Sequence, residues 1–135
     1  MAEDVQMERD LTRDLLTRLN DQNGHVREAA AEAMAMNTED EDWRPEEMIR
    51  QGGIEVLKER LLDKNLHTVS SVLEIIVATA ANGGEEELIS AGMIAILDTM
   101  RDHRDPGVRE RVREALWLLE PEVEDVVTSK PQDEY

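Results

Sequence analysis

The sequence predicts an all-α protein, a right-handed α-solenoid of about three repeated units. Three stretches each run from a polar corner into an amphipathic helix: residues 20–33, 63–76 and 102–115. Their first apolar anchors, Val26, Val69 and Val108, are 43 and 39 residues apart, a period typical of stacked helical units. With no Phe, one Tyr and two Trp, the core must consist of the aliphatic residues and Met that line helix–helix contacts.

The first two predicted helices form an antiparallel pair. Leucines at helical spacing predict a helix over about residues 4–20: Leu11, Leu15, Leu16 and Leu19. Residues 21–24 supply a turn. A second helix follows, and the small residues on its apolar face allow a close backbone approach: Val26, Ala29, Ala30, Ala33 and Met34.

A second unit follows the acidic loop predicted at residues 38–42. Pro45 suits the first position of a short helix that ends at Gly52 and Gly53. Residues 54–62 and 69–80 predict two further helices, the second of which is the most apolar and forms the buried middle. Trp43 and Met48 have the spacing of a hydrophobic staple, although an exposed partner anchor at Trp43 is the alternative.

The pattern then returns 39 residues later without gaps, because residues 86–92 answer residues 47–53. Residues 105–107 open the last helix, whose inward side chains begin at Val108, and Pro121 closes it. We therefore expect one repeat domain over residues 1–120, followed by an acidic, largely disordered tail over residues 121–135.

The charge balance restricts the partners. The net charge is −17, from 32 acidic and 15 basic residues. Such a chain is predicted to bind neither nucleic acid nor a membrane, and to attract a cationic protein in the cytoplasm. The alternative is that the acidity only keeps the protein in solution. No apolar stretch has signal or membrane-spanning length.

Catalytic and metal-binding patterns are not found. Cysteine is absent, which excludes disulfides and thiolate sites. No nucleophile has a base and an acid at a distinctive spacing, and no glycine-rich loop follows a predicted strand, so we expect no enzyme, no catalytic residue and no cofactor. His25, His67 and His103 fall in different units, too far apart for one metal ion, so no metal site is expected.

A short helix, a glycine bend after residues 86–92, a second helix, a polar corner and a long third helix together resemble armadillo repeats, and the two-helix first unit is closer to HEAT repeats. The resemblance implies that the long third helix of each unit lines a concave groove. There it presents a Trp and, four residues later, an Asn that grips the backbone of a bound peptide. Counted from the valine anchors, the Trp positions here hold Glu32, Ile75 and Glu114. The Asn positions hold Met36, Thr79 and Leu118, so a peptide-holding asparagine ladder is not expected.

The residues expected along the groove instead predict an acidic protein-binding site. Glu28 and Glu32, and likewise Glu110 and Glu114, lie four residues apart and share a helix face. Ile75 and Thr79 are expected at its centre, and the partner is expected to be a basic protein segment. The alternative is a solvated face paired with arginines.

The last helix offers a further surface. Trp117 and Leu118 are expected there as a capping or docking patch, and Arg109 and Arg113 precede Trp117 at steps of four residues. The alternative function is therefore a structural module that self-associates or caps a larger assembly through this helix, although a monomer is favoured.

Overall fold

The structure is a computed structural model that describes residues 2–120, with side chains from residue 5 onward. In this part of the chain every regular element is an α-helix. In chain order the helices are α1 (Ala2–Leu19), α2 (Gly24–Asn37), α3 (Glu46–Arg50), α4 (Gly53–Arg60), α5 (Leu66–Ala81), α6 (Glu85–Ser90), α7 (Met93–Asp98) and α8 (Pro106–Leu119). The predicted acidic tail, residues 121–135, lies outside the described residues.

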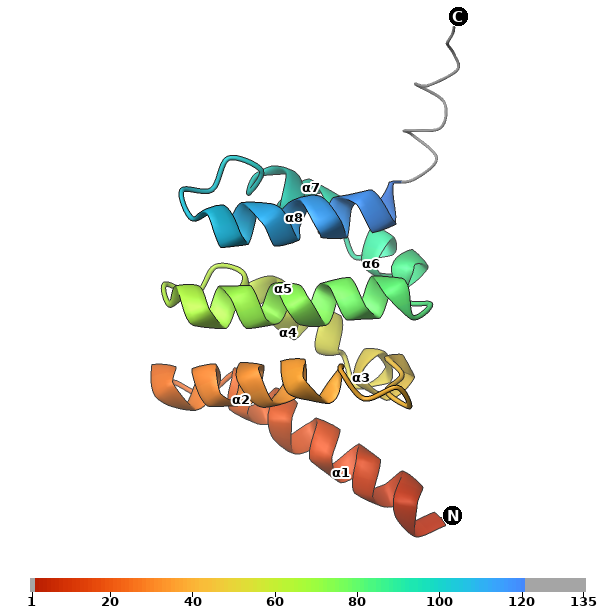
Figure 1. The fold of residues 1–135 in the computed structure, drawn as a ribbon. Coiled ribbons are helices and arrows are strands. Elements are labelled where there is room, and N and C mark those ends of the chain that lie inside the picture. Colours follow the sequence, from red (N-terminus) through yellow and green to blue (C-terminus); the bar gives the residue numbers. More distant parts are fainter. Residues whose placement is uncertain (1, 121–135) are drawn as a thin grey trace, which may run out of the picture.

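The helices stack in three layers, which contain α2, α5 and α8 in turn (Figure 1). We call these three parallel helices the long helices. Helices α2, α5 and α8 lie side by side and run in the same direction, with α4 and α7 behind them. Helices α1 and α2 form the first unit, α3 to α5 the second, and α6 to α8 the third. The predicted all-α solenoid of about three units is confirmed.

The core runs through all three layers. Each long helix places apolar side chains at the same two positions, and all six are at most 7% exposed: Ala30, Val72 and Val112, and then Met34, Ile76 and Leu116. Leu15, Leu57 and Leu97 face them from α1, α4 and α7 and are also buried. Each large aliphatic side chain buried in this way stabilises the fold by about 1.5–3 kcal/mol.

A polar side chain caps the start of each long helix. The side chain of Asn23 accepts a hydrogen bond from the His25 N–H, that of Asn65 accepts from the N–H groups of His67 and Thr68, and that of Asp105 accepts from the Val108 N–H. These caps satisfy N–H groups that have no partner within the helix. The caps are 42 and 40 residues apart.

This spacing corrects the predicted period of 43 and 39 residues. Val26 and Val108 follow their caps by three residues, whereas Val69 follows Asn65 by four. Thr68 therefore occupies the valine position in the middle unit, and it is fully buried. One residue turns a helix by about 100°. The prediction treats Val69 as the equivalent of Val26 and Val108, and so assigns the side chains of α5 to the wrong faces of the helix.

Glycine bends follow the same 40-residue period. Gly52 and Gly92, which precede α4 and α7, have φ angles of 81° and 82°, a left-handed conformation that favours glycine. The predicted match of residues 86–92 to residues 47–53 is therefore also wrong by one residue, because Gly92 corresponds to Gly52. The equivalent residue of the first unit, 42 positions earlier, is Asp10.

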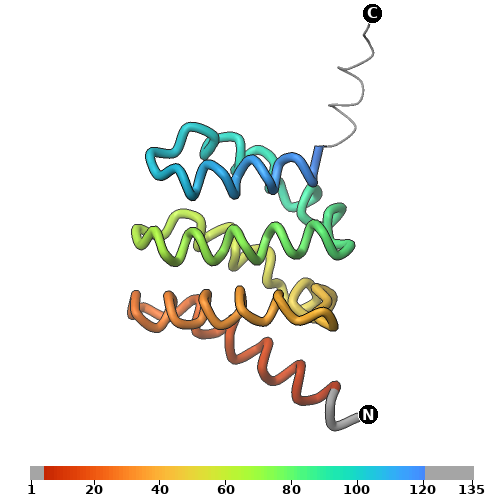
Figure 2. Tube along the Cα trace, viewed as in Figure 1, coloured from red at the N-terminus to blue at the C-terminus, as the bar shows by residue number. Residues whose placement is uncertain are grey.

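Helix α1 runs straight through Asp10, and its N-terminal half diverges from α2 (Figure 2). Its observed bounds agree with the helix predicted over residues 4–20 within two residues. No helix in residues 2–120 is long and apolar enough to cross a membrane.

An ionic cluster joins the first unit to the second. Asp63 is buried between the guanidinium groups of Arg27, whose Nε lies 2.8 Å from it, and Arg60, whose Nη1 lies 3.2 Å from it. The backbone N–H of Asn65 donates to the same carboxylate at 2.9 Å. Burial raises the pKa of Asp63, but the hydrogen bonds from Asn65 and Arg27 and the two positive charges outweigh it, so the pKa lies below its ordinary value.

We expect Asp63→Asn to lower the free energy of unfolding at pH 7 by about 1–3 kcal/mol, because it leaves buried donors without their charged acceptor. A carboxyl whose pKa is depressed by folding contributes stability above its unfolded pKa and loses it as the pH falls through the folded value. The difference between wild type and variant, measured by urea unfolding, should therefore shrink below about pH 4. A difference that is independent of pH would contradict this account.

The Thr68 hydroxyl is buried without a hydrogen-bond partner. Because valine occupies the equivalent position in the other two units, we expect Thr68→Val to raise the free energy of unfolding by about 1 kcal/mol. Thr79→Val is the control, since the equally buried Thr79 hydroxyl donates to the Ile75 carbonyl at 2.7 Å. Thermal and urea unfolding of both variants test this, and an equal or larger gain for Thr79→Val would contradict it.

Candidate functional site

The cap register places one glutamate at the same position of every long helix. Glu32, Glu74 and Glu114 are each nine residues beyond their caps. The three helices lie side by side (Figure 1), so equal positions follow one another from layer to layer. Glu32 and Glu114 are exposed and Glu74 is half-buried. We call the surface that α2, α5 and α8 share at these positions the long-helix face. Stacked helix axes lie about 8–10 Å apart, so the carboxylates repeat at roughly that distance.

Two further glutamates lie beside this row, about one helical turn earlier on α2 and α8. Glu28 and Glu110 are each five residues beyond their caps, as the sequence predicted for α2 and α8. Glu28 is half-buried and accepts a hydrogen bond from the Asn65 side chain at 2.9 Å. Glu110 is exposed and pairs with Arg113 at 2.8 Å. The four glutamates predicted in the groove therefore lie on α2 and α8 at matching positions.

Ile75 and Thr79 do not lie at the centre of this face. Both side chains are fully buried, because they follow the Asn65 cap by one residue more than Glu74 and Ala78 do and turn into the core. Their equivalents on α8, Ala115 and Leu119, are buried as well. The expectation that Ile75 and Thr79 line the groove surface is therefore wrong. Glu74 occupies the central position that sequence reasoning missed, and the spacing of the three capping residues could have found it.

Side chains from neighbouring layers contact two glutamates of the row. The Arg111 guanidinium lies 2.7 Å from Glu74, and the His67 ring Nε2 lies 3.1 Å from Glu32. Glu114 is exposed and makes no ion pair within the described residues. Pairs of a glutamate with an arginine, as expected for a solvated face, are therefore present at some positions. The long-helix face as a whole keeps more carboxylates than guanidinium groups. The excess of carboxylates can attract a positively charged group by electrostatics.

Within residues 2–120, no further layer covers the outward side of α8. Arg113 and Trp117 occupy positions that hold Ala31 and Ala35 on α2, and Leu73 and Val77 on α5. Ala31 and Leu73 are fully buried beneath the next layer, whereas Arg113 is exposed and Trp117 is 58% exposed. Leu118 is half-buried beside them. A charged residue at the centre of this side suits a terminal, solvent-facing layer.

Arg109, the first residue of the predicted series Arg109, Arg113 and Trp117, contacts the corner that precedes α8. Arg109 donates to the backbone carbonyls of His103, at 2.7 Å, and Arg104, at 3.3 Å, and so holds the preceding corner. Arg27 makes the same contacts with its own corner, to the carbonyls of Asp21 and Gln22. The arginine after each cap is thus a structural residue of the first and third units.

The corner histidines do not share an interaction partner. His67 approaches Glu32, and the His103 ring Nδ1 faces the Asp105 N–H at 3.0 Å. Across residues 2–120 no group of three or more histidine, aspartate or glutamate side chains is arranged to hold a metal ion.

Neither a protein-family model nor a curated protein matches this chain. Solved structures of engineered proteins do resemble it. One is a designed armadillo repeat protein, with a TM-score of 0.70 and 22% sequence identity over 78% of this chain. Two others are crystal structures of engineered proteins from the Northeast Structural Genomics Consortium, with TM-scores of 0.72 and 0.74 and identities of 19% and 21%, each over 82% of this chain.

These similarities define the class of fold. The chain has an armadillo/HEAT-like repeat fold, as its sequence predicted. It spans 45–46% of the length of the three engineered structures.

Proposed function

We propose that this protein is a non-catalytic scaffold that binds a basic segment of a partner protein on its long-helix face. The observation that carries the proposal is the row of Glu32, Glu74 and Glu114, one glutamate in each layer. A regular row of like charges on a stacked surface costs repulsion energy, which a cationic ligand relieves. The net charge of −17 favours the same kind of partner over a longer range.

The spacing of the row suggests the conformation of the segment. A polyproline II helix advances about 3.1 Å per residue with three residues per turn, so every third side chain points the same way about 9 Å further on. This distance is close to the 8–10 Å between stacked helix axes. A segment with arginine or lysine at every third position would therefore place one cation opposite each glutamate.

Arg111 acts as an internal competitor in this proposal. Its guanidinium already occupies the carboxylate of Glu74, the central glutamate of the row. The arriving cation must displace it or share the carboxylate. Removing the Arg111 charge should therefore strengthen binding, whereas removing the glutamates should weaken it.

The test uses a fluorescein-labelled peptide of four Arg-Pro-Pro repeats and the full chain, with fluorescence anisotropy as the readout. We expect saturable binding that weakens severalfold between 50 and 300 mM salt, since the ion pairs are exposed to solvent. A variant with Glu32, Glu74 and Glu114 all changed to Gln should bind at least tenfold more weakly, and Arg111→Gln should bind more tightly. Circular dichroism of each variant checks that the fold is kept.

A matched variant controls for net charge. Glu55, Glu59 and Glu87 are exposed on α4 and α6, away from the long-helix face, and changing all three to Gln alters the net charge by the same amount. We expect this variant to bind almost as well as wild type. Equal losses in the two triple variants, or binding that does not depend on salt, would contradict the proposal. A peptide of equal composition with its arginines contiguous tests the spacing, and should bind more weakly.

A further inference from the structure

The first unit differs from the other two in a way that leaves an apolar cavity open. In the second and third units the chain bends at Gly52 and Gly92, so that α3 and α6 fold back and bury Met48 and Leu88. In the first unit Asp10 replaces the glycine and α1 continues straight. The part of α1 that corresponds to α3 and α6 therefore does not fold back over its own unit.

The consequence is visible along one stripe of α1. Leu15 and Leu19 are buried against the core, but Leu11 and Met7, four and eight residues before Leu15, are 51% and 67% exposed. The positions equivalent to Leu11 in the other units, Gly53 and Met93, are buried. The apolar stripe of α1 thus extends about two turns beyond the surface that covers it.

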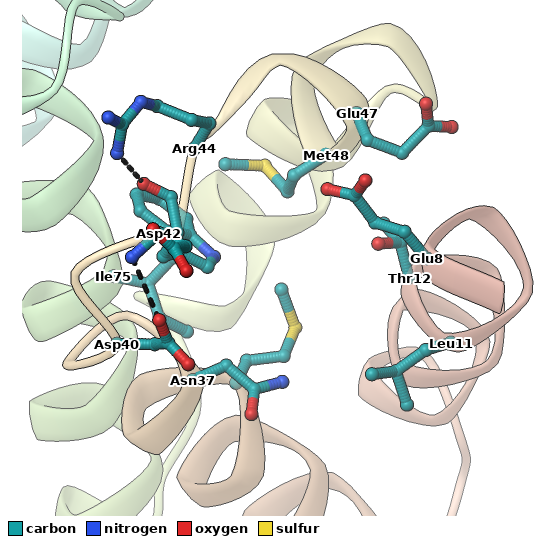
Figure 3. A pocket seen from close by; sticks show the side chains of 12 residues that line it. Glu8, Leu11, Thr12, Asn37, Asp40, Asp42, Arg44, Glu47, Met48 and Ile75 are labelled. Carbon is teal, nitrogen blue, oxygen red and sulfur yellow. Dashed lines mark hydrogen bonds between the residues drawn. The ribbon is translucent and has the colours of Figure 1, made fainter. Parts of the chain in front are cut away.

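A cavity of about 250 Å³ lies beside this uncovered stripe, and we call it the first-unit cavity. Its apolar lining comes from four helices and a loop: Leu11, Met34, Trp43, Met48 and Ile75. Figure 3 shows Leu11 on one side of the opening and Met48 and Ile75 on the others. Small-molecule sites usually enclose about 300–1,000 Å³, so this cavity is better suited to one or two side chains of a protein segment.

Trp43 and Met48, the pair predicted as a hydrophobic staple, belong to the lining of this cavity. Both side chains line it, and Trp43 is half-buried rather than fully covered. The observed helix begins at Glu46, one residue after the predicted start at Pro45. Trp43 therefore offers both an apolar wall and an optical probe of the cavity.

The rim of the first-unit cavity is acidic. Glu8, Asp40, Asp42 and Glu47 line it, against the single cation Arg44 (Figure 3). Glu47 is paired with Arg50, and the Arg44 guanidinium donates to the backbone carbonyls of Glu41 and Trp43 rather than to a rim carboxylate. The charges of the rim therefore favour an occupant that carries positive charge beside its apolar anchor.

We propose that the first-unit cavity docks a short amphipathic helix of a partner protein, with a leucine or methionine anchor and flanking lysine or arginine. The anchor would cover the stripe of Leu11 and Met7, as Gly53 and Met93, the equivalents of Leu11, are covered in the complete units. A second copy of this chain is disfavoured by the net charge of −17. The chain's own residues 121–135 are also disfavoured, because they carry five acidic residues and one lysine. This site is separate from the long-helix face and does not depend on binding there.

Trp43 fluorescence provides the test. In the full chain with Trp117→Phe, Trp43 is the one remaining tryptophan. The probe is a 14-residue helical Leu/Lys peptide with leucine along one face, and the two control peptides replace its leucines by serine or its lysines by glutamate. We expect the Leu/Lys peptide to change the Trp43 emission saturably, and each control peptide to bind at least tenfold more weakly.

Two variants locate the site. Glu8→Gln with Leu11→Lys should weaken binding at least tenfold, while Asp10→Asn with Asp14→Asn, which changes the net charge equally on exposed positions of α1, should not. All four substitutions are at exposed positions, and circular dichroism confirms folding. Unchanged binding by the first variant, or equal binding of the serine or glutamate control peptide, would overturn the proposal.

The Glu32, Glu74 and Glu114 variant separates the two proposals. If the Leu/Lys peptide still changes Trp43 emission in that variant, the first-unit cavity binds independently of the long-helix face. If the signal is lost there and kept in the Glu8 and Leu11 variant, the cavity proposal is wrong and the long-helix face alone binds cations.

Discussion

The capped start of each long helix is the constraint on which the rest of the structure depends. Asn23, Asn65 and Asp105 end the preceding corners and fix where each helix begins. Because a helix turns about 100° per residue, the position of the cap decides which side chains enter the core and which reach the solvent. The buried positions, the end of the stack and the row of glutamates all follow from this register.

Much of the fold could be predicted from the sequence, because helical periodicity, turn residues and repeated corners agree with one another. The middle unit was misregistered because Val69 was a stronger apolar signal than Thr68, the residue that is buried at the equivalent position. Buried threonines look like surface residues to a hydrophobic pattern. The acidic residues of α2 and α8 were placed at matching positions, and the spacing of the three capping residues would have added Glu74. The first-unit cavity, in contrast, required the stacking of the layers.

The first unit departs from the repeat because it has Asp10 where the other two units have a glycine. This difference also leaves the first-unit cavity open. Where Gly52 and Gly92 let the chain fold back, Asp10 keeps α1 straight and leaves apolar side chains uncovered. In the last described layer, Arg113 is exposed at a position where the other two layers have buried residues. The two ends therefore differ in chemistry, with an apolar, acid-rimmed opening at the first unit and a charged surface at the last. The long-helix face lies between them.

Backbone amide NMR of the ¹⁵N-labelled chain, titrated with the Arg-Pro-Pro peptide, tests the central claim most directly. We expect the largest shift changes around Glu32, Glu74 and Glu114, one in each of the three layers. Changes concentrated on α1 and residues 38–45, or spread evenly over the acidic surface, would contradict a binding row set by the helix caps.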